Sequence, residues 1–240
     1  MRRSLYLGWV YTMIGLWTLV ILPTSLLIMI LTGSHRIAHR IHSRFWGRMI
    51  LWTCGVRLRV HGIDRLRRDA AYVLMINRSS HFAVYAVAAG IPLQWRAVLG
   101  MKLRNVPVFA WITLLAGHIF IDSRRTRQAI ATLDAAADKL HSGLSGLIFP
   151  EGKHHEERTL LPFRLGGFHL AVHAGIPVVP LTAVEHRRHG ASGSVSILDL
   201  YVDPPIATMD RTTDDVPILM ERTRHAMEQH LTDAAAQPTT

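Results

Sequence analysis

The sequence has little cysteine: Cys54 is the only one among 240 residues. A single thiol excludes an internal disulfide, and a cysteine-based metal site needs at least two cysteines. The chain also lacks the glycine fingerprint of dinucleotide-binding Rossmann folds and the phosphate-binding P-loop. Internal repeats and low-complexity linkers are missing as well. These absences disfavour nucleotide chemistry of those two kinds.

Acidic side chains are in the minority, with 17 Asp and Glu against 27 Lys and Arg, which gives a formal net charge of +10. Such a balance favours an anionic partner, either nucleic acid or acidic lipid, whereas the simpler alternative is a solvated basic surface. The sequence contains no helix-turn-helix signature, zinc finger or RNA-binding aromatic motif. We therefore expect no nucleic-acid partner.

Charged side chains are absent altogether from residues 4–33. This run exceeds the ~20 apolar residues that a helix needs to cross a bilayer, and no small-residue cleavage site of a secretory signal follows it. Pro23 interrupts the run, so a kinked span and a re-entrant hairpin both remain open. Only Arg2 and Arg3 precede it, while four arginines lie within residues 36–48. The positive-inside tendency therefore predicts a membrane location with the main domain on the cytoplasmic face.

Residues 35–53 place apolar side chains three to four positions apart, with arginines and histidines between them. This spacing predicts a basic amphipathic helix that lies on anionic headgroups. His35 and His39 have the i, i+4 spacing of a zinc pair. However, Arg36 and Arg40 would repel a cation and no acidic third ligand is evident, so we expect no metal.

After Gly55, short apolar runs alternate with longer amphipathic ones, which predicts an α/β fold: a mixed, mostly parallel central sheet flanked by helices. Strands are predicted at residues 56–60, 71–76, 95–99, 118–121, 146–149, 178–184 and 194–202. Helices are predicted at residues 80–89, 106–115, 125–141, 166–174 and 213–232. The expected organisation has three parts: a membrane-embedded helical segment with the basic amphipathic helix at 1–55, the α/β domain at 56–233 and a disordered tail at 234–240.

Four segments fall at predicted strand ends, where open α/β sheets bind ligands. They read 77-NRSSHFA-83, 117-GHIFIDSRR-125, 149-FPEGKHHEE-157 and 175-GIPVVPLT-182. In the third, Pro150 and Gly152 predict a turn directly after a strand, with Glu151 and Lys153 at its mouth.

In this order the four segments resemble the motifs of the glycerol-phosphate and lysophosphatidate (1-acyl-sn-glycerol-3-phosphate) acyltransferase family. The resemblance covers about residues 56–205, and Lys102, Phe163 and Arg164 fit the pattern between the motifs. It implies the fold of that family and a membrane-bound protein. The implied reaction transfers a fatty acyl chain from acyl-CoA or acyl carrier protein (acyl-ACP) to a lysophospholipid such as 1-acylglycerol 3-phosphate. The expected partners are membrane phospholipid, the acyl thioester donor and acyl carrier protein, with no cofactor beyond the donor and no metal.

The first motif departs from the family at its catalytic pair. The family motif reads Asn-His, four residues, then Asp; here Asn77 matches, but Arg78 and Ala83 stand where the His and Asp belong. In the family the His removes the proton of the acceptor hydroxyl and the Asp orients it. Arginine, with a pKa above about 12, cannot act as a base near neutral pH, and alanine can orient nothing. The usual mechanism of the family is therefore chemically unavailable.

His81 is the candidate replacement base, because it lies about one helical turn beyond Arg78. In the family motif the Asp lies five residues after the His, which from His81 is position 86, and that residue is Ala86. The carboxylate partner of His81 would therefore have to come from another strand end, from Glu151 or Asp122. His81 and Glu151 are therefore the predicted catalytic residues. The alternative is that His81 only caps or packs the helix.

The second and third motifs have lost arginines that, in the family, help to hold the acceptor phosphate. Ser123 replaces one of them, and Lys153 and His154 stand where the third motif has Thr-Arg. The resemblance implies that substrate binding falls to the remaining residues, Arg78, Lys102, Arg124, Phe149, Pro150, Gly152 and Lys153. Two functions stay open: an active acyltransferase, or a catalytically silent relative that binds phospholipid or acyl thioester.

Overall fold

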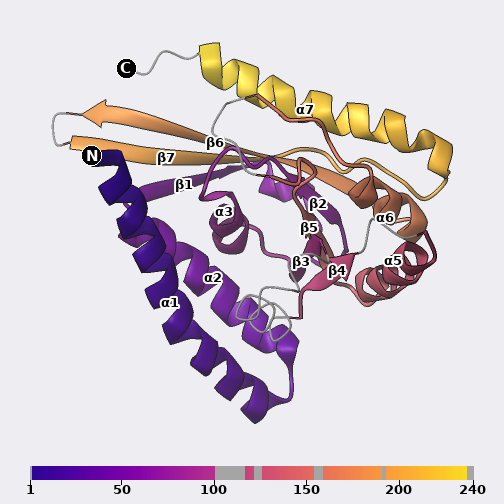
Figure 1. Cartoon of the computed structure of the whole chain (residues 1–240), viewed down its shortest axis with the longest axis horizontal. Coiled ribbons are helices and arrows are strands. Elements are labelled where there is room, and N and C mark those ends of the chain that lie inside the picture. The colour runs from indigo at the N-terminus through magenta and orange to yellow at the C-terminus, as the bar shows by residue number, and fades with distance from the viewer. Residues whose placement is uncertain (1, 101–116, 122–125, 154–158, 191–192, 237–240) are drawn as a thin grey trace.

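A computed structural model of the chain (Figure 1) describes residues 2–100, 117–121, 126–153, 159–190 and 193–236. The strands of this part are β1 (Val56–His61), β2 (Val73–Ile76), β3 (Trp95–Gly100), β4 (Ile119–Ile121), β5 (Ser145–Ile148), β6 (Val178–Gly190) and β7 (Gly193–Val202). The α-helices are α1 (Arg2–Thr32), α2 (His35–Thr53), α3 (Ala83–Gly90), α5 (Thr126–His141), α6 (Gly166–Ala174) and α7 (Val216–Ala236). The described residues also contain two short 3-10 helices, η1 (Ile63–Arg65) and η3 (Thr213–Asp215).

The strands form one sheet in the order β1-β7-β6-β2-β5-β3-β4. Neighbours run parallel except β6 and β7, which pair antiparallel from Leu181↔Val202 to Gly190↔Gly193. β1 and β7 therefore run opposite to the other five strands. Every residue of the central strands β2 and β5 is buried, as expected for parallel strands covered on both faces. The predicted mixed, mostly parallel sheet is confirmed.

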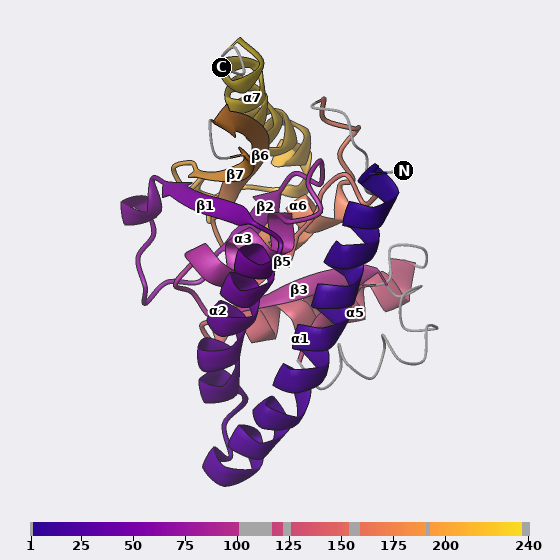
Figure 2. The ribbon, with the colours of Figure 1, turned by 90° about the vertical axis from the view of Figure 1, so that its left-hand side faces the viewer.

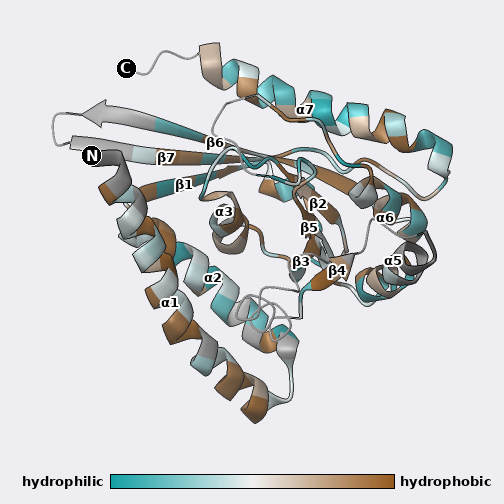
Figure 3. Cartoon of the chain, in the orientation of Figure 1, coloured by the Kyte–Doolittle hydropathy of each residue, from teal (hydrophilic) through white to brown (hydrophobic). Residues whose placement is uncertain are grey.

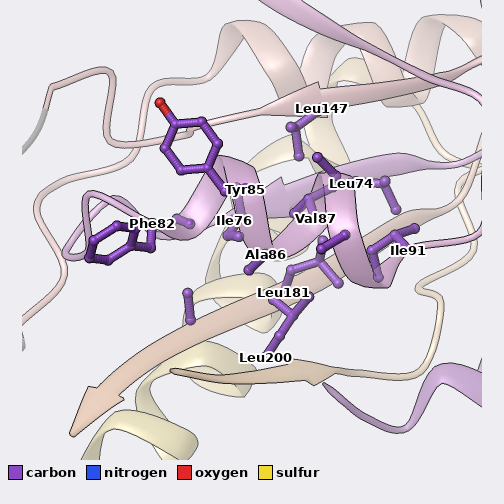
Figure 4. Packing of buried hydrophobic residues seen from close by; sticks show 14 of the residues in the cluster. Leu74, Ile76, Phe82, Tyr85, Ala86, Val87, Ile91, Leu147, Leu181 and Leu200 are labelled. Carbon is purple, nitrogen blue, oxygen red and sulfur yellow. The ribbon is translucent and has the colours of Figure 1, made fainter. Parts of the chain in front are cut away.

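Helices cover both faces of this sheet. α2 and α3 cover one face, with α1 outside α2, and α5, α6 and α7 cover the other (Figure 1). Figure 4 shows the first face, where α3 and its flanks lie against the strands. The labelled side chains from β2, β5, β6 and β7 are Leu74, Ile76, Leu147, Leu181 and Leu200, and those from α3 and its ends are Phe82, Tyr85, Ala86, Val87 and Ile91.

The small residues of α3 let α2 approach it closely. A Cβ added to Gly47 of α2 would lie 2.7 Å from the carbonyl oxygen of Tyr85 and 2.8 Å from the backbone nitrogen of Ala89. Backbone atoms cannot turn aside as a flexible side chain can, so Gly47 is the residue that permits this crossing. The contact attaches α2, and α1 through it, to the α/β domain.

α1 and α2 form a hairpin whose tip points away from the sheet (Figure 2). At the open end of the hairpin, the first half of α1 is bonded to the end of α2. The Tyr6 hydroxyl donates to the Cys54 carbonyl at 3.2 Å, and Trp9 Nε1 donates to the Thr53 carbonyl at 3.2 Å. Further along, Trp46 Nε1 of α2 donates to Thr18 Oγ1 at 3.1 Å. α1 therefore lies along α2 rather than apart from the domain.

Apolar residues recur along α1 (brown in Figure 3), and many of their side chains are exposed. Residues Gly8–Thr32 form a helix long and apolar enough to cross a membrane, and only 6% of its apolar window is buried in the protein. The exposed large apolar residues of the hairpin are Leu5, Trp9, Tyr11, Leu16, Leu19, Val20, Leu26, Leu27, Ile30, Leu31, Ile37, Phe45 and Trp52.

Several predicted boundaries shift. α3 begins at Ala83 instead of residue 80, so the polar first motif is a loop. β6 continues to Gly190 because its outer half pairs with β7 alone and needs no apolar sequence. α7 continues to Ala236, so the first three residues of the predicted disordered tail are helical, and Ala234 among them is buried against the domain. The helix predicted at 106–115 lies outside the described residues.

Candidate active site

The first and third motifs meet because their strands are neighbours. β2 pairs with β5 in parallel, with Met75 opposite Ile148, and the two motifs follow the carboxyl ends of these strands. Two loops that leave adjacent parallel strands at the same edge lie side by side. The first-motif loop and the third-motif turn therefore lie together at one edge of the sheet.

Glu151 joins the two motifs. Its carboxylate is buried, and Oε1 accepts the backbone N–H of Arg78 at 2.7 Å while Oε2 accepts that of Leu161 at 2.9 Å. The turn that carries it closes with a hydrogen bond from the Gly152 N–H to the Phe149 carbonyl at 3.0 Å, and Gly152 has a φ of 71°. Pro at the second and Gly at the fourth position are the residues that such a turn prefers. Glu151 thus connects the first-motif loop, the third-motif turn and the segment around Leu161.

Arg78, at the position of the family's catalytic base, is directed toward the third-motif turn. Its side chain is exposed, and its Cζ lies 4.9 Å from the centroid of the Phe149 ring, a cation–π geometry. At the position of the family's Asp, Ala83 is 1% exposed and belongs to the core, and Ala86 is buried too. Neither alanine position can supply a carboxylate.

The first-motif loop is pinned to β6 as well. Asn77 is fully buried, and its amide mimics a β-pair with Ala183: Oδ1 accepts the Ala183 N–H at 2.7 Å, and Nδ2 donates to the Ala183 carbonyl at 3.0 Å. Ser80 Oγ donates to Glu185 Oε2 at 2.9 Å, while Ser196 Oγ donates to Glu185 Oε1 at 2.8 Å. The polar loop after β2 therefore keeps its shape through buried and partly buried hydrogen bonds to a strand more than 100 residues away. Sequence analysis missed Glu185, for which the only signal was the polar residue directly after the predicted strand 178–184.

His81 lies in the loop before α3. The expectation that it lies one helical turn beyond Arg78 is therefore wrong, because the helix begins only at Ala83. Its ring is half-buried and meets the ring of Tyr11 of α1 edge-on, with 6.2 Å between centroids. The candidate base thus lies beneath the N-terminal helix. Its catalytic role, like that of Glu151, stays a prediction.

The remaining predicted binding residues divide into two groups. Phe149, Pro150, Gly152 and Lys153 all lie on or directly after the third-motif turn, with Pro150 buried and Lys153 exposed. Lys102 and Arg124 lie outside the described residues, as do Asp122, Ser123 and His154. The described part of the site therefore consists of the first-motif loop, the third-motif turn and the segment that begins at residue 159.

Arg164 adds a cation that sequence analysis did not assign to the site. Its backbone N–H donates to the Pro150 carbonyl at 2.8 Å, so it is held beside the third-motif turn, and its side chain is exposed. The only signal for it was the fit of Phe163 and Arg164 to the pattern between the motifs. Spacing in the sequence alone could not show that Arg164 lies beside the third-motif turn in space.

His39, weighed above as part of a zinc pair, has a different environment. Its ring meets the Trp95 ring edge-on, with 5.2 Å between centroids. Burial, together with the charge of Arg96, lowers the pKa of His39 to about 3. His39 is thus a neutral imidazole in a partly buried contact between α2 and β3.

The mixed sheet, the two joined loops at its strand ends and the attached apolar hairpin define an acyltransferase-type α/β protein. A model of the family described as Acyltransferase matches residues 57–184, and the chain belongs to this acyltransferase family. The resemblance seen in the four motifs is thereby confirmed.

Individual relatives support the same family membership. The chain is 31% identical over 186 residues to human 1-acyl-sn-glycerol-3-phosphate acyltransferase alpha, which covers 74% of this chain and 65% of the relative. It is 26% identical over 216 residues to the 1-acyl-sn-glycerol-3-phosphate acyltransferase of Saccharomyces cerevisiae, which covers 87% and 71%. The crystal structure of the 1-acyl-sn-glycerophosphate acyltransferase PlsC of Thermotoga maritima has the same fold. Its TM-score is 0.77 at 16% identity, covering 100% of this chain and 98% of that one.

Proposed function

We propose that the protein transfers a fatty acyl chain from acyl-CoA or acyl-ACP to the hydroxyl of a lysophospholipid such as 1-acylglycerol 3-phosphate. The observation that carries this proposal is the hydrogen bond from the Arg78 N–H to Glu151, because it joins the first and third of the motifs by which the chain resembles the family. The names of the similar enzymes from human and yeast support the same acceptor class.

In this reaction the acceptor hydroxyl oxygen attacks the thioester carbonyl carbon, the carbon–sulfur bond breaks, and the hydroxyl proton ends on the departing thiolate. His81 is the proposed carrier of that proton, since Arg78 and Ala83 cannot take it. The guanidinium of Arg78 supplies positive charge beside the turn, where it stabilises negative charge on the substrate. Without the family's His and Asp pair we expect a slow enzyme.

Replacing His81 tests this assignment. In detergent micelles with lysophosphatidate and acyl-CoA, His81→Ala should lower kcat by about 10²- to 10⁴-fold, the usual contribution of a general base, while lysophosphatidate binding persists. His225→Ala, an exposed histidine of α7, is the matched control and should keep the wild-type rate. Unchanged turnover in His81→Ala removes His81 from the mechanism.

A second candidate function is a catalytically silent relative that binds phospholipid or acyl thioester. It is favoured by one specific observation: Ala83 and Ala86 of α3 are buried in the core, so neither position supplies a carboxylate beside the first-motif loop. A wild-type chain that binds lysophosphatidate but yields no acyl product identifies this case. Turnover at ordinary enzyme rates, about 1 to 1000 per second, rejects it.

For location, we propose that the α1 and α2 hairpin inserts into one leaflet of a membrane, with the α/β domain on the cytoplasmic face. The exposed apolar side chains of α1 support insertion, and the bonds of Tyr6 and Trp9 to the end of α2 favour a hairpin over a free span. Leu27→Glu together with Leu31→Glu should abolish flotation of the protein with anionic vesicles, because each buried charge costs about 2.5 to 3.5 kcal/mol. Flotation of this variant at the wild-type level contradicts the insertion of α1.

A further inference from the structure

Residues 160–164, which follow the third motif in the chain, form neither helix nor strand. Their backbone groups therefore need partners outside regular secondary structure, because a buried carbonyl or N–H without a partner costs free energy. Two of these partners belong to the site. The Leu161 N–H donates to Glu151 Oε2 at 2.9 Å, and the Arg164 N–H donates to the Pro150 carbonyl at 2.8 Å. The segment thus supports the third-motif turn at two points.

The carbonyl groups of the same segment are held by α7, near the end of the chain. Arg224 of this helix donates from one guanidinium nitrogen to the Leu161 carbonyl at 3.0 Å and from another to the Leu160 carbonyl at 2.9 Å. Its Nε lies 2.8 Å from Oε1 of Glu228, one helical turn further along α7. Its Cζ lies 5.4 Å from the centroid of the Phe163 ring. One planar guanidinium, with its fork of N–H donors, therefore contacts an irregular segment at several residues.

Leu161 connects Arg224 to the site through its own peptide groups. Its carbonyl accepts from Arg224, its N–H donates to Glu151, and the other oxygen of Glu151 accepts the Arg78 N–H at 2.7 Å. A continuous series of hydrogen bonds thus runs from α7 to the first-motif loop, which also contains the candidate base His81. A change at Arg224 should therefore reach this loop.

We propose that Arg224 is a positioning residue for acyl transfer: through Leu161 and Glu151 it keeps the first-motif loop and the third-motif turn in the relative placement that the reaction requires. This inference rests on the proposed acyl transfer. Its guanidinium nitrogens are bonded to the segment and to Glu228, so Arg224 acts through other residues and not on the substrate. Placement matters because a displacement of about 1 Å, caused far from the reacting atoms, can lower a rate by about 10²-fold.

Turnover of an Arg224 variant tests the effect on the reaction. Arg224→Met keeps an unbranched stem but has no donor, so both carbonyl bonds are lost. In detergent micelles with saturating lysophosphatidate and acyl-CoA it should lower kcat by about 10- to 100-fold. Arg222→Met is the matched control, because Arg222 is an exposed arginine of the same helix, and it should keep the wild-type kcat. Thermal melts set an assay temperature at which every variant is folded, and folded Arg224→Met protein with the wild-type kcat overturns the proposal.

Amide hydrogen exchange of the full chain in micelles, without substrate, tests the route. Arg224→Met should speed exchange of the Leu161 and Arg78 N–H groups by about 3- to 10-fold, the worth of one hydrogen bond, while the N–H groups of β2 and β5 exchange at the wild-type rate. Unchanged exchange at Leu161 and Arg78, or equal acceleration throughout the domain, overturns the route through Glu151. A wild-type chain without turnover overturns acyl transfer itself, whereas selective acceleration at these two N–H groups still supports the connection from α7 to the site.

Discussion

Arg78→His combined with Ala83→Asp is expected to raise the rate of acyl transfer by at least about 10²-fold, the lower end of what a general base contributes. The His restores a group that titrates near neutral pH, and the Asp restores a carboxylate that orients it. Position 83 begins α3, where the helix N-terminus favours a negative charge. Initial rates with lysophosphatidate and acyl-CoA, compared with the wild-type chain, measure the effect.

The control for this gain is Arg78→His with Ala83→Asn, which has a side chain of the same size but no charge. It should recover little of the rate, because the amide cannot stabilise an imidazolium as a carboxylate does. A thermal melt of each variant checks that the buried position 83 accepts the larger side chain. Folded Arg78→His, Ala83→Asp protein with no gain in rate would show that the loops no longer hold the family's reactive geometry.

Glu151→Ala is expected to lower the free energy of unfolding by about 2 to 5 kcal/mol, because the N–H groups of Arg78 and Leu161 both lose their acceptor. Both loops should loosen, so lysophosphatidate binding should weaken as well. Denaturant unfolding in detergent measures the first effect and binding isotherms the second. The loss in stability should be among the largest for a polar residue of this site, since one carboxylate serves three segments.

Two comparisons give this result its meaning. Glu151→Gln keeps one carbonyl oxygen but turns an amide NH2 toward a backbone donor, so its loss should be intermediate. Glu221→Ala, on the exposed face of α7, should change stability by less than about 0.5 kcal/mol. If Glu151→Ala keeps full stability yet abolishes turnover, Glu151 acts in catalysis, as its sequence position had suggested, and not in holding the loops.

Local patterns of the sequence predicted those parts of the fold that depend on local structure. The predicted helices at 35–53 and 166–174 have the limits of α2 and α6, because the amphipathic spacing lies within each helix and a glycine or turn residue follows directly after it. α3 was predicted to begin three residues early, because apolar residues such as Phe82 continue the helical pattern into the loop. There the hydrogen bonds of Asn77 and Ser80 to β6 hold the backbone in another conformation.

The sequence by itself determined which chemical groups are present: the four motifs in order, the loss of a base and a carboxylate at Arg78 and Ala83, and an uncharged stretch before the domain. Only the tertiary structure decided which groups meet. Glu151 reaches the N–H of Arg78 across 73 residues, Asn77 pairs with Ala183 across 106, and Arg164 occupies the space above Gly152. The strand order β6-β2-β5 brings these residues together. Pairing between distant strands is set by the packing of the whole sheet, which no local spacing encodes.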